Sequence, residues 1–166
     1  MTDTILLAAH FANLAHRGQV RKYTGRPYIT HPCRVAGLTA IHKLASPELV
    51  AIAYLHDVIE DCGISHRELE QTFGKDIADG VLALTNPSKD LKLPRKERKR
   101  IDREHVANLS RELKVVKLLD RIDNIRELDR NNSFFPVYAN ESLLLAEVLK
   151  DADIDLWNEL TSLCAV

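Results

Sequence analysis

Residues 51–61 (AIAYLHDVIED) combine an apolar helical stripe with four polar side chains that could do chemistry: His56, Asp57, Glu60 and Asp61. A helix would place positions i, i+1, i+4 and i+5 in one polar stripe beside its core face. Three carboxylates in one stripe repel one another unless a cation lies among them. Imidazole and carboxylate together suit a divalent metal of intermediate hardness. Taken alone, the segment fits an ordinary solvated acidic face equally well.

A second cluster follows the apolar run that precedes residue 120. Asp120 comes directly after this run, and Asp123 and Asn124 follow at i+3 and i+4 on the same side of a helix. Buried carboxylates are rare unless they are paired or bound to a metal, so Asp120 is a candidate ligand. The alternative interpretation is an ion pair of Asp120 with Arg121 or Lys117.

The third candidate is His31, which stands immediately before Pro32. A proline fits the first turn of a helix, so His31 is expected at a helix N-terminus. A lone histidine there is more often a cap or a core residue than a ligand. Here, however, His31 is the third member of a set that also contains the His56-Asp57 pair and Asp120.

The elements that position these residues are predicted to be helices alone. Apolar residues recur at helical spacing, period-two patterns are scarce, and glycine and proline number six each. Pro32, Pro47, Pro94 and a Ser65–Glu68 capping box mark helix starts. Helices are expected near 2–17, 32–44, 47–61, 65–72, 75–86, 94–107, 112–130, 137–150 and 153–163, with loops at 18–31 and 87–93. Without a repeat or a linker, the sequence predicts one all-α domain over residues 1–166.

Composition excludes several classes of protein. The 166 residues include 23 basic and 24 acidic side chains, and the net charge of −1 argues against a nucleic-acid-coating protein. Three widely spaced cysteines without a Cys-x-x-Cys pair favour a reducing, cytoplasmic location over a disulfide scaffold. No apolar run approaches the roughly 18 residues that a membrane helix needs. The main basic run, residues 92–103, is interrupted by acids and is typical of a solvated helix face, although Arg95 could help to attract an anionic substrate.

The order His31, His56-Asp57, Asp120 resembles the HD phosphohydrolase superfamily. Flanking motifs narrow the resemblance to the (p)ppGpp hydrolase domain of RelA/SpoT proteins, from about residue 8 to residue 128. These motifs are Gly18-Gln19, Arg21-Lys22, Gly25, Pro27-Tyr28-Ile29-x-His31-Pro32, Leu55-His56-Asp57-x-x-Glu60-Asp61, Phe73-Gly74 and Lys117-Leu118-x-Asp120-Arg121-x-x-Asn124. The length and the segment 93–100 are similar to the stand-alone small alarmone hydrolases, which include the metazoan SpoT homologue.

The resemblance implies an all-helical fold and a role for each motif. His31, His56, Asp57 and Asp120 would bind one Mn²⁺ ion, and Glu60 and Asp61 would orient or deprotonate the attacking water. Such acid–base assistance is worth about 10²–10⁴-fold. The remaining candidates would hold the nucleotide substrate: Arg21, Lys22, Asn124, Arg95 and Tyr138. The expected reaction is removal of the 3′-pyrophosphate of guanosine tetra- or pentaphosphate, a step of the stringent response.

Two departures from the family pattern keep a second substrate open. The loop at residues 21–25 is one residue longer than in typical bifunctional members, and Glu127 stands where those proteins have threonine. A phosphatase acting on another phosphorylated nucleotide such as NADPH is therefore the first alternative. A non-catalytic nucleotide-binding module would have lost a ligand or the Glu60-Asp61 pair, and every one of these positions is filled. The oligomeric state is left open.

Overall fold

The computed structural model describes residues 2–165, and its regular elements are helices. Within this range there is no β-strand, only one isolated antiparallel bridge between Val20 and Pro27. The all-α prediction is therefore confirmed. The contacts divide the chain into two compact units, unit 1 (residues 1–85) and unit 2 (residues 86–166). The single domain over residues 1–166 stays a prediction.

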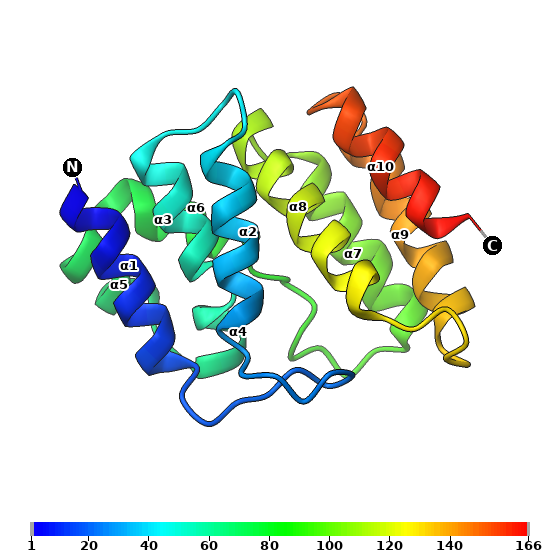
Figure 1. Cartoon of the computed structure of the whole chain (residues 1–166), viewed down its shortest axis with the longest axis horizontal. Helices are drawn as coiled ribbons and strands as arrows, with labels where there is room; N and C mark the ends of the chain where they lie inside the picture. Colours follow the sequence, from blue (N-terminus) through cyan, green and yellow to red (C-terminus); the bar gives the residue numbers. More distant parts are fainter. Residues whose placement is uncertain (1, 166) are drawn as a thin grey trace. The chain divides into compact units, whose positions relative to one another are not determined.

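Unit 1 contains the first six helices of the chain (Figure 1). They are α1 (Thr2–Ala15), α2 (Thr30–Ala40), α3 (Pro47–Leu55), α4 (Val58–Cys62), α5 (His66–Phe73) and α6 (Lys75–Leu84). Proline occupies the first turn of α3, and the Ser65–Glu68 capping box begins α5, as the sequence predicts. Helix α2 begins two residues earlier than predicted, so His31 and Pro32 lie inside its first turn.

The core of unit 1 is built around α3, which packs against α1, α2 and α6. All but three of its residues are buried, and two of the buried ones, Ala51 and Ala53, are small enough for close helix packing. The others are Leu49, Val50, Ile52 and Leu55. Gly80 on α6 shows how close this packing is, because a Cβ atom at this position would lie 2.5 Å from Ile52 Cδ1. Only glycine fits there without a shift of the isoleucine.

The predicted helix 47–61 is interrupted at His56 and Asp57, where α3 ends and α4 begins. Asp57 has φ −102° and ψ −6°, in the bridge region that many active-site residues occupy. The prediction of one continuous helix is therefore wrong at these two residues. A contact of the His56 ring accompanies the interruption: its Nδ1 lies 2.8 Å from the Ala53 carbonyl oxygen. That carbonyl is the one an uninterrupted helix would offer to the Asp57 N–H.

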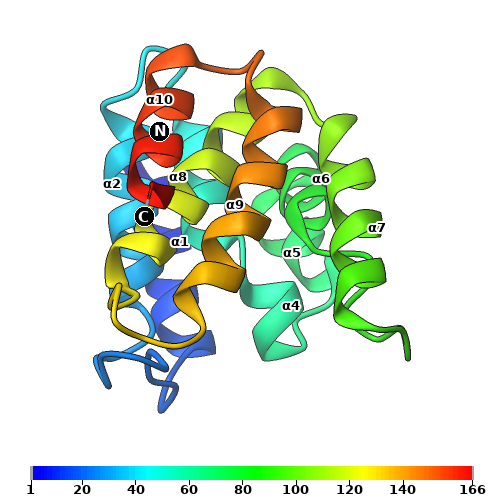
Figure 2. The same ribbon diagram turned by 90° about the vertical axis from the view of Figure 1, so that its right-hand side faces the viewer.

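Unit 2 contains the last four helices: α7 (Arg95–Ala107), α8 (Arg111–Glu127), α9 (Phe135–Leu149) and α10 (Ile154–Cys164). Helix α9 packs against the other three, as Figure 2 shows. Ser110 caps α8 and Asp153 caps α10 by accepting backbone N–H groups of the first turn. None of the described helices has the length and apolar character needed to cross a bilayer.

The two predicted loops are both present. Residues 18–29 contain turns and the single bridge in place of a helix, and residues 85–94 contain no helix. Pro94 is the N-cap of α7 and not a first-turn residue as predicted. The loop before α2 brings the Tyr28-x-x-His31 segment to the start of that helix, and this placement is what the site in unit 1 depends on.

Candidate metal centre

Three of the predicted ligands converge in unit 1. His31 Nε2 lies 3.2 Å from His56 Nε2, and Asp57 Oδ2 lies 3.6 Å from the first and 3.1 Å from the second. Both histidines are buried, whereas 16% of the Asp57 side-chain surface is exposed to solvent. His31 comes from the first turn of α2, and the other two come from the interruption between α3 and α4. Two nitrogens and one oxygen therefore point at one small volume.

The hydrogen bond of His56 to Ala53 fixes which nitrogen of the ring faces the cluster. A carbonyl oxygen only accepts, so the Nδ1 atom, 2.8 Å away, carries the proton. In the neutral ring, Nε2 then presents its lone pair toward His31 and Asp57. A metal-ligating histidine commonly donates its other N–H to a carbonyl or carboxylate in this way. His56 therefore has the tautomer that metal binding requires.

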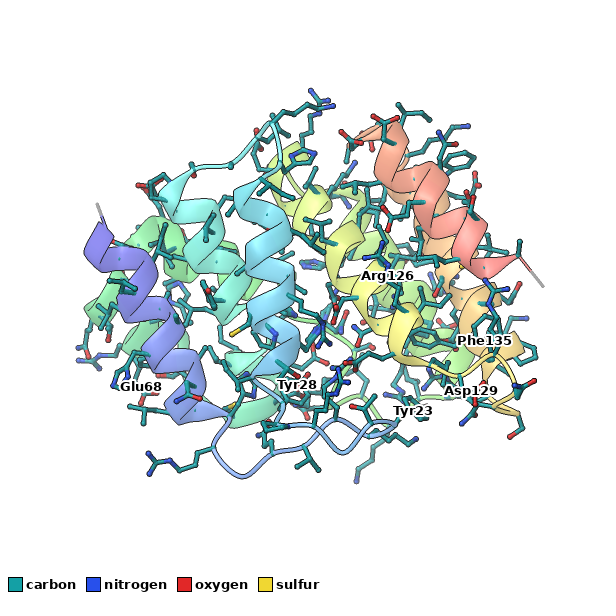
Figure 3. The ribbon with its side chains drawn as sticks, in the orientation of Figure 1. Tyr23, Tyr28, Glu68, Arg126, Asp129 and Phe135 are labelled. Atoms are coloured by element: carbon teal, nitrogen blue, oxygen red, sulfur yellow. The ribbon has the colours of Figure 1, made fainter. Side chains whose placement is uncertain are left out.

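Tyr28, which is labelled in Figure 3, contacts the acidic part of the cluster. Its hydroxyl lies 2.7 Å from Asp57 Oδ2 and 2.9 Å from Asp61 Oδ2. Burial raises the pKa of the Tyr28 hydroxyl, and the negative charges of Asp57 and Asp61 raise the pKa further. The hydroxyl is therefore a neutral donor at physiological pH, and it orients the Asp57 carboxylate beside the two imidazoles.

Polar residues also surround the Tyr28 ring itself. The buried His16 ring stacks on the Tyr28 ring, with centroids 4.6 Å apart and 24° between the planes. His16 Nδ1 lies 2.8 Å from Gln19 Oε1 and 3.2 Å from Cys62 Sγ. The Gln19 amide donates to the Asp61 carbonyl at 3.1 Å. The end of α1, the following loop and α4 are thus tied together around the Tyr28 ring.

The other predicted residues of unit 1 surround this cluster. Glu60 is half-buried on α4, and Asp61 is exposed and bonded to Tyr28 as described. The Arg21 guanidinium lies over the Tyr28 ring, 5.4 Å from its centroid, which brings one predicted nucleotide contact to the site. Lys22 is exposed and lies over the Tyr23 ring instead.

The predicted fourth ligand, Asp120, belongs to α8 in unit 2. It is buried, with 7% of its surface exposed. Lys117 Nζ lies 3.2 Å from one carboxylate oxygen, and the Asn124 amide donates to the other at 2.5 Å. The pair with Lys117 that the sequence offered as an alternative therefore exists, but it is buried and not a surface pair. Asn124, predicted to bind substrate, orients the Asp120 carboxylate.

The last two candidates also lie in unit 2. Arg95 makes a two-point ion pair with Glu141, at 2.7 and 2.8 Å, and its guanidinium lies over the Phe134 ring. Tyr138 is half-buried, and the Arg121 guanidinium lies over its ring at 4.7 Å from the centroid. Substrate contacts by Arg95 and Tyr138 stay predictions.

The donor set of unit 1 fits a divalent transition metal. Each of His31, His56 and Asp57 offers one ligand atom, and these atoms all lie within 4.8 Å of one another. A mixed imidazole and carboxylate set suits ions of intermediate hardness and leaves coordination positions open. In the metal-free protein the two Nε2 atoms, 3.2 Å apart, can share one proton as a hydrogen bond. A metal ion would take the place of this proton, because ligating imidazole nitrogens must be deprotonated.

Sequence reasoning assigned no role to the residues that support the cluster, although Tyr28 and Gln19 belong to the quoted motifs; the other two are His16 and Cys62. Tyr28 carries the clearest signal, because it lies three residues before His31 and so reaches the same side of the chain as the first turn of α2. His16 and Cys62 carry no comparable signal, since a histidine 46 positions from a cysteine has no local pattern. Their contact depends on how α1 and α4 pack.

Comparison with known proteins places the chain in a family. A sequence profile of the HD domain matches residues 8–145. A Xenopus tropicalis protein named guanosine-3′,5′-bis(diphosphate) 3′-pyrophosphohydrolase MESH1 is 39% identical over 129 residues, which are 76% of this chain and 70% of the relative. The Homo sapiens protein of the same name gives the same identity and coverage.

A solved structure supports the same assignment. It is described as a metazoan orthologue of SpoT that hydrolyses ppGpp, and it has a TM-score of 0.81 and 26% sequence identity to this chain. The match covers 96% of this chain and 93% of that structure. The family resemblance predicted from the motif series is therefore confirmed. The chain belongs to the HD domain family and, within it, to the group that contains the MESH1 pyrophosphohydrolases.

Proposed function

We propose that this protein is a metal-dependent hydrolase that removes the 3′-pyrophosphate of guanosine tetra- and pentaphosphate. The convergence of His31 Nε2, His56 Nε2 and Asp57 Oδ2 on one volume carries the proposal. The relatives named as guanosine-3′,5′-bis(diphosphate) 3′-pyrophosphohydrolases supply the substrate class. The full motif series, including the Glu60-Asp61 pair, favours catalysis over passive nucleotide binding.

Mn²⁺ is the proposed ion, with Asp120 as the fourth ligand. Imidazole nitrogens and carboxylate oxygens are a donor set that accepts this ion. The proposal for Asp120 is supported by its position in the sequence motif and by its burial. Lys117 and Asn124 contact its two carboxylate oxygens and so hold the side chain in one orientation. A buried carboxylate held in this way is ready to act as a ligand.

The chain's own residues then have distinct roles in the reaction. A bound divalent ion lowers the pKa of a water ligand and offsets charge on the attacked phosphate. Glu60 and Asp61 orient the water and accept its proton. The water oxygen bonds to the 3′-linked phosphorus, the bond from that phosphorus to the ribose 3′-oxygen breaks, and the 3′-oxygen takes a proton. The products are GDP, when ppGpp is the substrate, and pyrophosphate.

Substrate binding is assigned to residues of both units. Arg21 is held over the Tyr28 ring and can stack on a purine base. Lys22 supplies a point charge to phosphate, and Asn124 a hydrogen bond to the nucleoside. Arg95 and Tyr138 are proposed to contact the far end of the nucleotide. We infer a cytoplasmic location from the three free cysteines, since oxidising compartments favour disulfides.

Product analysis tests the proposal. Purified protein with Mn²⁺ should convert ppGpp to GDP and pyrophosphate, resolved by anion-exchange chromatography, and chelation by EDTA should stop the conversion. Asp57→Asn should abolish it, whereas Asp76→Asn, the same change at an exposed position of α6, should not. Release of phosphate from NADPH with no conversion of ppGpp would replace the proposed substrate with the alternative one. No turnover of either nucleotide by metal-loaded protein would overturn the enzyme assignment.

A further inference from the structure

A cavity of about 360 Å³ lies between α7 and α9 in unit 2. Its α7 side presents four cations in one stripe, Arg95, Lys96, Lys99 and Arg103. Its α9 side includes Val137 and Leu144, which are 47% and 44% exposed. The volume falls in the range of about 300–1,000 Å³ that is typical of small-molecule sites. A concave surface with one basic and one apolar wall suits an anion attached to a less polar group.

A smaller cavity of about 20 Å³ shares three of these residues, Lys99, Arg103 and Glu141. Arg121 and Lys117 of α8 also line it, together with Asp102 of α7. It has room for about one water-sized atom. Because these residues line both, the two cavities adjoin, and we call the two together the α7–α9 pocket.

The cations of the α7–α9 pocket are only partly neutralised. Acidic side chains pair with three of them: Arg95 with Glu141, Lys99 with Asp102, and Lys117 with Asp120. Among the side chains that the structure describes, from residue 4 to residue 165, no acidic one pairs with the other three, Lys96, Arg103 and Arg121. Their charges lie against one cavity in a chain whose net charge is −1. Like charges gathered in this way favour binding of an anion.

Arg121 points most directly to a ligand. Its Nε and Nη1 atoms are buried, and neither has a hydrogen-bond partner among the described residues. The Tyr138 ring holds the guanidinium plane in place at 4.7 Å. Buried donors without a partner are rare in proteins, and those of a charged group cost more than neutral ones. The planar N–H pattern of arginine matches the oxygens of a phosphate.

We propose that the α7–α9 pocket is a binding site for a phosphate or pyrophosphate group, with Arg121 lining its smaller cavity and Arg103 and Lys96 lining its larger one. A water molecule could satisfy the Arg121 donors, but it would leave the three unpaired cations without a counter-charge. A phosphate-class anion would accept hydrogen bonds from the Arg121 donors and would also supply the counter-charge. Binding needs neither metal nor turnover, so the proposal stands apart from the proposed catalytic activity.

Calorimetric titration of the full-length, metal-free protein with pyrophosphate, and with orthophosphate in parallel, tests the site. Wild type should bind one anion per chain. Arg121→Met, which keeps the contact with Tyr138 but removes the charge, should weaken the affinity about tenfold or more, as expected for loss of a charge-assisted hydrogen bond. Arg103→Met should weaken it several-fold and decides the test if the Arg121 variant does not fold.

Arg100→Met is the matched control. Arg100 is on α7 as well, but it pairs with Glu97 and Glu104 and does not line the α7–α9 pocket. Its loss should leave the affinity unchanged. Equal weakening in all three variants would mean that the anion responds only to total charge, and no weakening in any would mean that it binds elsewhere. Either result would overturn the proposed site.

Steady-state kinetics distinguish a phosphate group of the substrate from a free anion. This second measurement rests on the proposed function. If the pocket holds the uncleaved 5′-diphosphate of the substrate, Arg121→Met should raise KM for ppGpp about tenfold with little change in kcat. If it holds a free anion instead, Arg121→Met should leave KM for ppGpp unchanged. Any change in rate that added pyrophosphate causes in wild type should then be absent in this variant. Both results support the site. Calorimetry decides its existence even for a protein that turns over no ppGpp.

Discussion

The Tyr28 hydroxyl lies 2.7 Å from Asp57 Oδ2 and 2.9 Å from Asp61 Oδ2. One proton is thus directed at two carboxylates, the first a proposed metal ligand and the second a proposed catalytic residue. The ring carrying this hydroxyl stacks on the His16 ring and makes a T-shaped contact with the His31 ring. Tyr28 therefore couples the orientation of the proposed ligand to that of the proposed catalytic carboxylate.

Replacing Tyr28 with phenylalanine should impair both metal binding and catalysis. The substitution keeps the stacked ring and removes only the hydroxyl, so Asp57 and Asp61 lose their shared donor. Loss of a partner that orients a metal ligand typically lowers metal affinity or activity about 10- to 100-fold. The measurements are the Mn²⁺ dissociation constant and kcat with ppGpp. Tyr23→Phe is the control, because Tyr23 is exposed and donates no hydrogen bond in the described structure. Identical losses in both variants would contradict this role for Tyr28.

The close contact of Gly80 with Ile52 predicts a coupled pair of mutations. In Gly80→Ala the new Cβ would lie 2.5 Å from Ile52 Cδ1, so the free energy of unfolding should fall by about 1–3 kcal/mol despite the better helix propensity of alanine. Ile52→Val removes that Cδ1 atom and by itself should cost about 0.5–1.5 kcal/mol. The double variant should be more stable than the sum of the two losses predicts. Urea denaturation measures all three, and simple additivity would contradict the contact.

The capping box of α5 predicts a pH dependence of stability. Hydrogen bonds from the Ser65 hydroxyl and backbone N–H lower the pKa of Glu68 below its ordinary value of 4.5. A carboxyl with a lowered pKa stabilises the folded state above 4.5, and this contribution is lost as the pH falls through the lowered value. Glu68→Gln keeps the N-cap geometry without a titrating group.

Chemical denaturation between pH 7 and pH 3 tests this expectation. The stability advantage of wild type over Glu68→Gln should be constant near neutral pH and should shrink below pH 4.5. An advantage that stays the same down to pH 3 would show that ionisation of Glu68 does not stabilise the folded state.

Local patterns in the sequence predict most of the helices and the identity of the ligands. The capping box at Ser65 and the proline of α3 are confirmed because each depends on neighbouring residues alone. The interruption at His56 and Asp57 was not predictable from helical periodicity. It accompanies a side-chain contact of the His56 ring with the Ala53 carbonyl, and apolar spacing carries no information about such a contact.

The support of the site depends on tertiary packing and is therefore harder to read from the sequence. His16, Tyr28 and Cys62 meet only because α1, the following loop and α4 pack together. Likewise, the sequence cannot show that two donors of Arg121 lack a partner, because this depends on which side chains the fold brings near them. Motif spacing predicted which groups would do chemistry. The contacts that hold and neutralise these groups could be identified only from the folded structure.

Turnover of ppGpp measured during titration with Mn²⁺ tests the central claim most directly. Starting from metal-free protein, the rate of pyrophosphate release should rise from zero and saturate when one ion is bound per chain. Asp57→Asn should neither bind the ion with comparable affinity nor release pyrophosphate at saturating Mn²⁺, while Asp76→Asn should behave as wild type. Turnover that is independent of added metal, or full activity in Asp57→Asn, would contradict a metal centre formed by His31, His56 and Asp57.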